Sequence, residues 1–246
     1  MFPLRDTIPS SRFPAVTLGL IVVNVVVFLA ELSLSAHSLD AVFSQWGVVP
    51  CTLTGSCPGR LRLSRGLLAV AAPPPYLTMV SSLFLHGGWM HIIGNMWSLW
   101  IFGDNVEDRM GRGAFLSFYL LSGLAAGALH VAFNTRSPVP TVGASGAIAG
   151  VMGAYLLLFP HARVVTLVPI FIFVQTIELP AVAFLGFWFV SNLWSGLGAL
   201  VASTRAGGVA WWAHIGGFVV GCLWALPLRR RTAPQRPWYA PEDTRW

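Results

Sequence analysis

A serine and a histidine in two apolar segments have the side chains that nucleophilic catalysis requires. Ser145 lies in TVGASGAIAG and His214 in AHIGG, where most neighbours are glycine or alanine. A serine hydroxyl is a weak nucleophile until a base such as imidazole removes its proton. The pattern is not the G-x-S-x-G elbow of soluble hydrolases, because Ala147 occupies the last position. Its interpretation therefore depends on where the chain places Ser145 and His214.

His91 and Asn95, in HGGWMHIIGN, are candidate donors for the oxyanion that forms during acyl transfer. They are four residues apart and share one face of a helix. His86, if the helix extended that far, would be turned about 140° away from His91. This angle argues against a metal site made by the two histidines, and the chain has no HExxH motif. A His and Asn pair in a membrane helix also serves as an interhelical hydrogen bond, and that structural role stays open.

The composition indicates a membrane protein. Of the 246 residues, 55% are hydrophobic and only 10% are charged, against about 25% charged residues in ordinary soluble domains. We expect an all-α membrane protein with a six-helix core at 13–228, an N-terminal segment at 1–12 and a C-terminal tail at 229–246. Six apolar runs approach the length of a span: Phe13–Leu34, Met79–Phe102, Ala114–Phe133, Ser145–Phe159, Pro180–Val201 and Val209–Leu228. The first run lacks a small-residue cleavage site, so a signal peptide is not expected.

The arginines predict the topology, since all fifteen basic residues are arginine. The positive-inside rule places both termini in the cytosol, because of arginines at the ends of the predicted spans: Arg5, Arg12, Arg109, Arg112, Arg163, Arg229, Arg230 and Arg231. Arg60, Arg62 and Arg65 are exceptions in a long exterior loop, where charges have less influence. In the same loop, Cys51 and Cys57 could form a disulfide or remain free thiols. The tail is expected to lie loosely at the cytosolic surface.

Helix lengths place three polar side chains at one depth. A helix from Ser145 to Pro160 is roughly 22 Å long, whereas a hydrocarbon core is about 30 Å thick. Its start should therefore lie about 8 Å below the outer surface. The same helical rise places His214 roughly 22 Å from Arg229, and His91 roughly 20 Å from Asp104. Irregular backbone such as TVGASG is tolerated at that depth only against protein or a water-filled cavity.

Small residues on two of the runs predict that Ser145 and His214 meet. Ala149 and Gly153 follow Ser145 by four and eight residues, and Gly217 and Gly221 follow His214 by three and seven. Such faces allow helix backbones to approach closely. We therefore expect the fourth and sixth runs to pack together directly beneath the two polar side chains.

Together these motifs resemble those of the rhomboid intramembrane serine proteases. HGGWMHIIGN, GASG and AHIGG carry the resemblance, each in its expected helix. It implies a dyad of Ser145 as nucleophile and His214 as general base, without metal or cofactor. It further implies an oxyanion hole and its supporting backbone, made by His91, Asn95, the Ser145 amide, Gly143 and Gly146.

The resemblance also implies the reaction, which is hydrolysis of a peptide bond in or near the transmembrane helix of a single-span substrate. The setting would be the bacterial inner membrane, with the lipid bilayer and no nucleic acid as a partner. The oligomeric state is not readable from the sequence.

Two departures from the family pattern concern how the site is supported. An aromatic residue commonly stands four after the serine and packs against the histidine, and here Ala149 occupies that position. A Trp-Arg pair often found in the first exterior loop is absent from residues 35–77. Among the acidic residues considered as a third member of the site, only Glu31 lies near the outer end, and nothing in the sequence ties it to His214. The others fall near the cytosolic side: Asp104, Glu107, Asp108 and Glu178.

Two functions from other classes are alternatives to the protease. One is a rhomboid-like pseudoprotease that binds membrane helices and escorts them; such proteins usually lack the serine or the histidine. The other is a small-solute transporter with His91, Asn95 and His214 along its path. That reading lacks the repeated pair of interrupted helices that transporters commonly contain.

Overall fold

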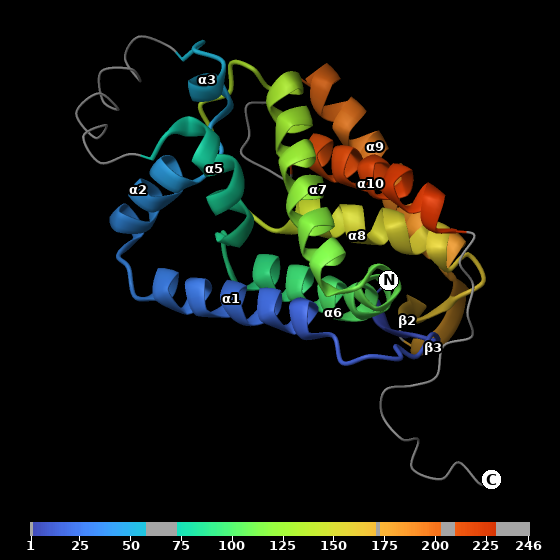
Figure 1. Cartoon of the computed structure of the whole chain (residues 1–246). Coiled ribbons are helices and arrows are strands. Elements are labelled where there is room, and N and C mark those ends of the chain that lie inside the picture. Colours follow the sequence, from blue (N-terminus) through green and yellow to red (C-terminus); the bar gives the residue numbers. More distant parts are fainter. Residues whose placement is uncertain (1, 58–72, 171–172, 203–209, 230–246) are drawn as a thin grey trace, which may run out of the picture.

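The computed structural model describes residues 2–57, 73–170, 173–202 and 210–229, and within them the protein is mostly helical (Figure 1). Within these ranges, four helices have the length and hydropathy of a membrane span: α1 (Ala15–Leu32), α7 (Arg112–Phe133), α9 (Ala181–Ala202) and α10 (Trp211–Ala225), which the 3-10 turn η2 (Leu226–Leu228) continues. The protein is therefore a multi-pass membrane protein. A count of six spans stays a prediction, because α6 (Trp89–Met110) carries several charged residues and α8 (Ser145–Leu158) has only 14 residues.

The prediction of one continuous span over Met79–Phe102 is wrong. The chain forms a short helix, α5 (Pro75–Ser81), and a 3-10 turn, η1 (Ser82–Phe84), before α6 begins at Trp89. Gly88 interrupts them with φ 150°, a conformation that side-chain-bearing residues rarely adopt. His86 consequently lies outside α6, and the angle of about 140° expected for a continuous helix does not apply to it.

The expectation of an all-α protein is wrong for one end of the molecule, where three strands form an antiparallel sheet. The order is β1 (Phe2–Asp6), β2 (Arg163–Ile170) and β3 (Phe173–Pro180), with Asp6 opposite Val164 and Arg163 opposite Pro180. The β2 and β3 segments are rich in β-branched residues, which favour strands. β1 has no such composition, so its strand depends on pairing with a segment about 160 residues away.

Helix α8 forms the centre of the bundle and contacts α6, α7, α9 and α10 (Figure 1). Every residue from Gly146 to Tyr155 is buried, because neighbours cover all sides of the helix. The helix begins at Ser145, just after Gly143, which has φ 124°. The first residue of the central helix is thus the serine that the sequence singles out.

Glycines bring the backbones of α8 and α10 into direct contact. A Cβ at Gly217 would overlap the carbonyl oxygen of Gly146, and one at Gly221 would overlap that of Gly150. A Cβ at Gly153 would overlap the carbonyl oxygen of Phe218. Gly153, Gly217 and Gly221 therefore lie at the helix contact as predicted, joined by Gly146 and Gly150. Ala149, also predicted for this contact, is fully buried.

A disulfide between Cys51 and Cys57 decides between the two alternatives left open for these thiols. It closes a turn after α3 (Pro50–Leu53), which follows α2 (Ala36–Trp46) in the loop between α1 and α5. The hydroxyls of Thr54 and Ser56 donate to the carbonyl oxygen of Thr135, at 2.7 and 2.6 Å. These bonds fasten this loop to the one between α7 and α8. Arg60, Arg62 and Arg65 lie outside the described residues.

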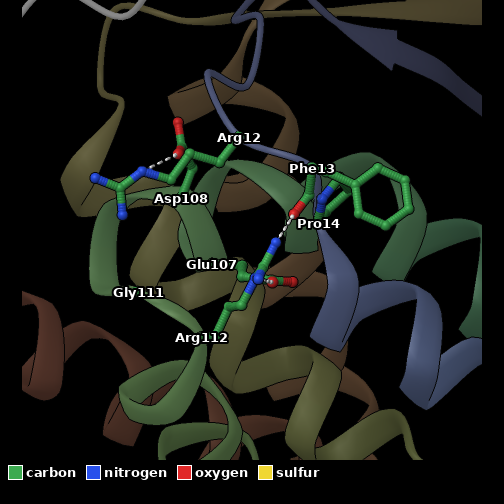
Figure 2. Close-up of a pocket in the computed structure, with 7 residues that line it drawn as sticks. All are labelled: Arg12, Phe13, Pro14, Glu107, Asp108, Gly111 and Arg112. Carbon is green, nitrogen blue, oxygen red and sulfur yellow. Dashed lines mark hydrogen bonds and ion pairs between the residues drawn. The ribbon is translucent and has the colours of Figure 1, made fainter. Parts of the chain in front are cut away.

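The opposite end of the molecule contains a cavity of about 330 Å³ between the start of α1 and the end of α6 (Figure 2). Glu107 accepts hydrogen bonds from the amides of Val16 and Thr17, at 3.0 and 2.7 Å, and so caps α1. Asp108 accepts from the amide and hydroxyl of Ser11, at 2.8 and 2.6 Å. Both carboxylates therefore hold the start of α1 against α6. The acidic residues that line the cavity thus have a structural role.

Several of the arginines used to predict the topology gather at this end. Arg12 pairs with Asp108 at 3.9 Å and Arg112 with Glu107 at 4.0 Å. Arg109 donates to the carbonyl oxygen of Leu228 at 2.8 Å. Arg12, Arg109 and Arg112 thus lie together at this end of the molecule, and the positive-inside rule associates such a cluster with the cytosolic side. Residues 230–246, including Arg230 and Arg231 and nearly all of the tail expected at the cytosolic surface, lie outside the described residues.

Candidate functional site

Ser145 and His214 come together although they are 69 residues apart in the chain. Ser145 Oγ lies 2.8 Å from His214 Nε2, which is an ordinary hydrogen-bond distance. Ser145 is the first residue of α8, and His214 lies in the first turn of α10. The glycine contacts that bring these two helices together begin one residue beyond Ser145 and three beyond His214. The close packing of α8 and α10 therefore holds the two side chains together.

The second nitrogen of the imidazole also has a partner. His214 Nδ1 lies 2.7 Å from Oδ1 of Asn192, a buried residue of α9. Asn192 is not among the residues predicted for the site from the sequence. A signal was present, because a lone amide within the apolar run Pro180–Val201 is costly in a membrane unless it has a partner. What the sequence could not show was which residue that partner is.

Aromatic rings flank His214 despite the departure at Ala149. The Trp188 ring lies 5.7 Å from the imidazole, centroid to centroid, and the Trp211 ring meets it edge-on at 6.3 Å. Trp188 belongs to α9 and Trp211 to the start of α10. The aromatic packing that family members place on the serine helix thus comes here from two other helices.

His91 and Asn95 lie beside the loop that precedes Ser145. A Cβ at Gly143 would overlap the His91 ring and would lie 3.6 Å from the Asn95 side-chain nitrogen. Only glycine fits here, because the position combines a positive φ with this close approach. The Gly143 amide donates to the carbonyl oxygen of Ser82 at 2.8 Å, which anchors the loop. Gly146 is likewise confined, since its Cβ would lie 2.7 Å from that of Ala126.

Hydrogen bonds that involve His86 and Glu31 hold Asn95 in place. The Asn95 side-chain nitrogen donates to Nε2 of His86 at 2.9 Å. The backbone amide of His86 donates to the Glu31 carboxylate, with distances of 3.2 and 3.3 Å to its two oxygens. Neither contact was predictable from the sequence. Glu31 thus acts on the far side of the site from His214, through the backbone of His86.

A small cavity of about 30 Å³ adjoins Ser145. It is lined mostly by small or apolar residues, among them Gly123, Gly127 and Gly146, and by His130. The imidazole Nε2 of His130 lies 3.0 Å from the Thr141 hydroxyl, so this side chain is committed to the loop before α8. A space of this size accommodates one water molecule or a methyl-sized group.

The part of the chain that contains these residues matches a known family. A model of the rhomboid domain matches residues 74–231. The chain belongs to the rhomboid family. The matched region contains every residue described above for the candidate site, Asn192 included, except Glu31.

Three rhomboid relatives illustrate the range of similar proteins. "Rhomboid protein 1, mitochondrial" of Saccharomyces cerevisiae is 29% identical over 174 residues, covering 69% of this chain and 47% of the relative. "Presenilin-associated rhomboid-like protein A, mitochondrial" of Danio rerio is 31% identical, covering 61% and 37%. "Rhomboid protease GluP" of Bacillus subtilis is 33% identical, covering 61% and 25%. The chain therefore matches less than half the length of each.

Proposed function

We propose that this chain is an intramembrane serine endopeptidase that hydrolyses peptide bonds in or near the transmembrane helices of single-span membrane proteins. The 2.8 Å contact between Ser145 Oγ and His214 Nε2 carries the proposal. Membership of a family whose Bacillus subtilis member is named a protease supports it.

The reaction follows acyl-transfer chemistry. His214 Nε2 takes the proton of the Ser145 hydroxyl while Oγ attacks the carbonyl carbon of the substrate, giving a tetrahedral intermediate with a negatively charged oxygen. The imidazolium then gives its proton to the leaving amine, and the C–N bond breaks. Water, activated by the same imidazole, hydrolyses the acyl-enzyme and restores Ser145.

The oxyanion is assigned to the start of α8, together with His91 and Asn95. The first amides of a helix have no partner within the helix, and the helix dipole favours negative charge there. No side chain caps this end of α8, whose N-cap residue is Ala144. The Ser145 amide, with the side chains of His91 and Asn95 next to Gly143, supplies donors in a setting where donors are most effective.

Substrate selection follows from the small cavity and from the cost of unwinding a helix. A space of about 30 Å³ beside Ser145 favours a small residue before the scissile bond. A peptide bond within a helix must also be unwound, and each freed backbone group costs several kcal/mol in hydrocarbon. Gly or Pro just beyond the cut lowers this cost, by about 1 and 3 kcal/mol relative to Ala. We assign the cut to the exterior end of the substrate helix.

The membrane setting belongs to the same proposal. The arginines at the end that contains Glu107 and Asp108 favour a cytosolic location for that end and for both termini. We assign the chain to the bacterial inner membrane, and fractionation of the host cells tests that assignment.

A fluorophosphonate probe tests the chemistry in liposomes. Wild type should be labelled, and Ser145→Ala and His214→Ala should not. Ser98→Ala is the matched control, because it removes an exposed hydroxyl of α6 that donates only to its own helix. Labelling of Ser145→Ala at the wild-type level would show that the serine assignment is wrong. A wild type that binds model helices but is neither labelled nor hydrolytic would indicate the pseudoprotease.

A reconstituted single-span substrate tests selectivity. Replacing its small residue before the cut, or its Gly and Pro residues, by Leu should slow cleavage, with mass spectrometry locating the site. Equal cleavage of the all-Leu helix, or a cut in the cytosolic half, contradicts this account of selectivity and leaves the assignment of Ser145 and His214 intact.

A further inference from the structure

We propose that Asn192 is a positioning residue that holds His214 in the tautomer and orientation needed to accept the Ser145 proton. This inference rests on the proposed function, because it gives the base of that reaction its orientation. The contact of 2.7 Å between Asn192 Oδ1 and His214 Nδ1 carries it.

The orientation of the Asn192 amide is set by its own helix. The side-chain nitrogen donates to the carbonyl oxygen of Trp188, one turn earlier in α9, at 2.7 Å. A backbone carbonyl can only accept, so the NH₂ group must face Trp188. The amide oxygen therefore faces His214.

This orientation determines which imidazole nitrogen carries the proton. An amide oxygen only accepts, so Nδ1 of His214 must be the donor. In a neutral imidazole the other nitrogen, Nε2, then has a free lone pair. That nitrogen is the one 2.8 Å from Ser145 Oγ, and the hydroxyl donates to it. The three groups form a directed chain from Ser145 through His214 to Asn192.

Helix α9 is held where Asn192 can reach the imidazole. Gly196, one turn after Asn192, faces the start of α10: an added Cβ would lie 3.3 Å from Cβ of Trp211 and 3.4 Å from Cδ1 of Ile215. A larger residue at Gly196 would need these neighbours to move. Trp188 and Trp211, both packed against the imidazole, then limit its rotation.

A neutral amide suits this position better than a carboxylate. The imidazolium formed during the reaction strengthens its Nδ1–H bond to the amide oxygen, because a charged donor makes a stronger hydrogen bond. A buried carboxylate would also make such a bond, but its desolvation in the membrane interior is far more costly. Asn192 therefore orients the base without placing a charge in the bundle.

Two variants separate positioning from packing in a steady-state assay with a reconstituted model substrate. Asn192→Leu keeps the size and removes the acceptor, and kcat should fall roughly 10- to 100-fold with KM changed less than about twofold. Asn192→Asp can keep the acceptor, because a protonated carboxyl also donates to the Trp188 carbonyl, and should be at least about fivefold more active than Asn192→Leu. Ser191→Ala, whose hydroxyl donates to the same carbonyl at 2.8 Å from an exposed site, should match wild type.

The outcomes distinguish this inference from the proposed function. Wild-type kcat in Asn192→Leu, or equal losses in the Leu and Asp variants, would overturn the positioning role while Ser145 chemistry stands. If Asn192→Leu does not fold, nitrogen NMR of ¹⁵N-histidine-labelled wild type decides the question. A protonated Nδ1 on neutral His214 is expected, and a neutral imidazole protonated at Nε2 would overturn the inference. This measurement holds even if no substrate is cleaved.

Discussion

At the scale of single residues, hydrogen bonds join Ser145, His214 and Asn192 in one chain and Glu31, His86 and Asn95 in another. The first contains the hydrogen bonds of 2.8 and 2.7 Å on the two imidazole nitrogens. The second begins at Glu31 and ends at Asn95, whose amide is held at 2.9 Å by His86. Because His86 already holds the Asn95 amide in place, this donor needs little reorganisation when charge develops on a substrate oxygen.

Asn95→Ala should leave measurable but weakened hydrolysis. Loss of one oxyanion donor raises the barrier by roughly 3 to 4 kcal/mol at most, so kcat should fall by up to about 10³-fold. The assay is cleavage of the reconstituted model substrate, with Ser98→Ala on the same helix as the control. Unchanged kcat in Asn95→Ala would restrict Asn95 to a structural role, through its hydrogen bond to His86.

At the scale of elements, the decisive contact is between α8 and α10. Neither helix could approach the other this closely with side chains at Gly217 or Gly221, because a Cβ there would overlap backbone oxygen atoms. Backbone atoms cannot give way as a flexible side chain can, so strain from a larger residue must separate the helices. Separation would move Ser145 away from His214.

Gly221→Ala should therefore lower both thermal stability and probe labelling. Overpacking in a close contact costs roughly 1 to 3 kcal/mol, and the helices must shift to admit the methyl group. The matched control is Gly94→Ala in α6, where an added Cβ meets nothing within 4 Å. That control should be neutral or more stable, by about 1 kcal/mol at most. Equal melting temperatures for the two variants in detergent would contradict the packing argument.

At the scale of the whole molecule, the two ends differ in how they are closed. One end contains the disulfide and the loops around the start of α8, and the other contains the sheet and the gathered arginines (Figure 1). The sheet end is tied to the central helix through Asp6. Oδ2 of this residue accepts hydrogen bonds from the Tyr155 hydroxyl of α8 and, at 2.9 Å, from the Asn105 side chain of α6.

The charge on Asp6 should make stability depend on pH. Burial raises the pKa of this carboxyl from 3.8 to about 7, with a further increase from Asp104 and an opposing effect from the Tyr155 hydrogen bond. A pKa raised by folding gives stability that is complete below pH 3.8 and is lost as the pH rises through about 7. The melting temperature of wild type should thus be a few degrees lower at pH 8.5 than at pH 5.5, since about 1 kcal/mol corresponds to about 2–4 °C at this chain length.

Asp6→Asn should flatten this pH dependence, because an amide oxygen accepts the same two bonds without titrating. The comparison uses thermal unfolding in detergent at both pH values. A variant whose pH dependence equals that of wild type would show that another group is responsible.

The topology should follow the arginines. A periplasm-sensitive reporter fused after Trp246 should be silent, and one inserted near Thr54, in the disulfide-bonded loop, should be active. The reverse pattern would place Ser145 near the cytosolic side and would contradict the predicted depth of the site below the outer surface.

The sequence by itself determined the membrane character, the approximate bounds of α1, α7, α9 and α10, and the prediction that Ser145 and His214 meet. These features depend on local hydropathy and residue type, which a single segment carries. Close helix packing was also foreseeable, because glycine at helical spacing is visible in the sequence. The exact contacts were not, since nothing in the sequence shows that Gly146 and Gly150 present their carbonyl oxygens to Gly217 and Gly221.

Only the tertiary structure decided the partners of the buried polar groups and the pairing of distant segments. Asn192 meets His214, Glu31 meets the His86 backbone, and β1 pairs with β2 across most of the chain. A buried amide or an unpaired strand edge requires a partner, but the sequence states only the requirement. Which group satisfies it depends on how α8, α9 and α10 pack, and that geometry arises from many contacts at once.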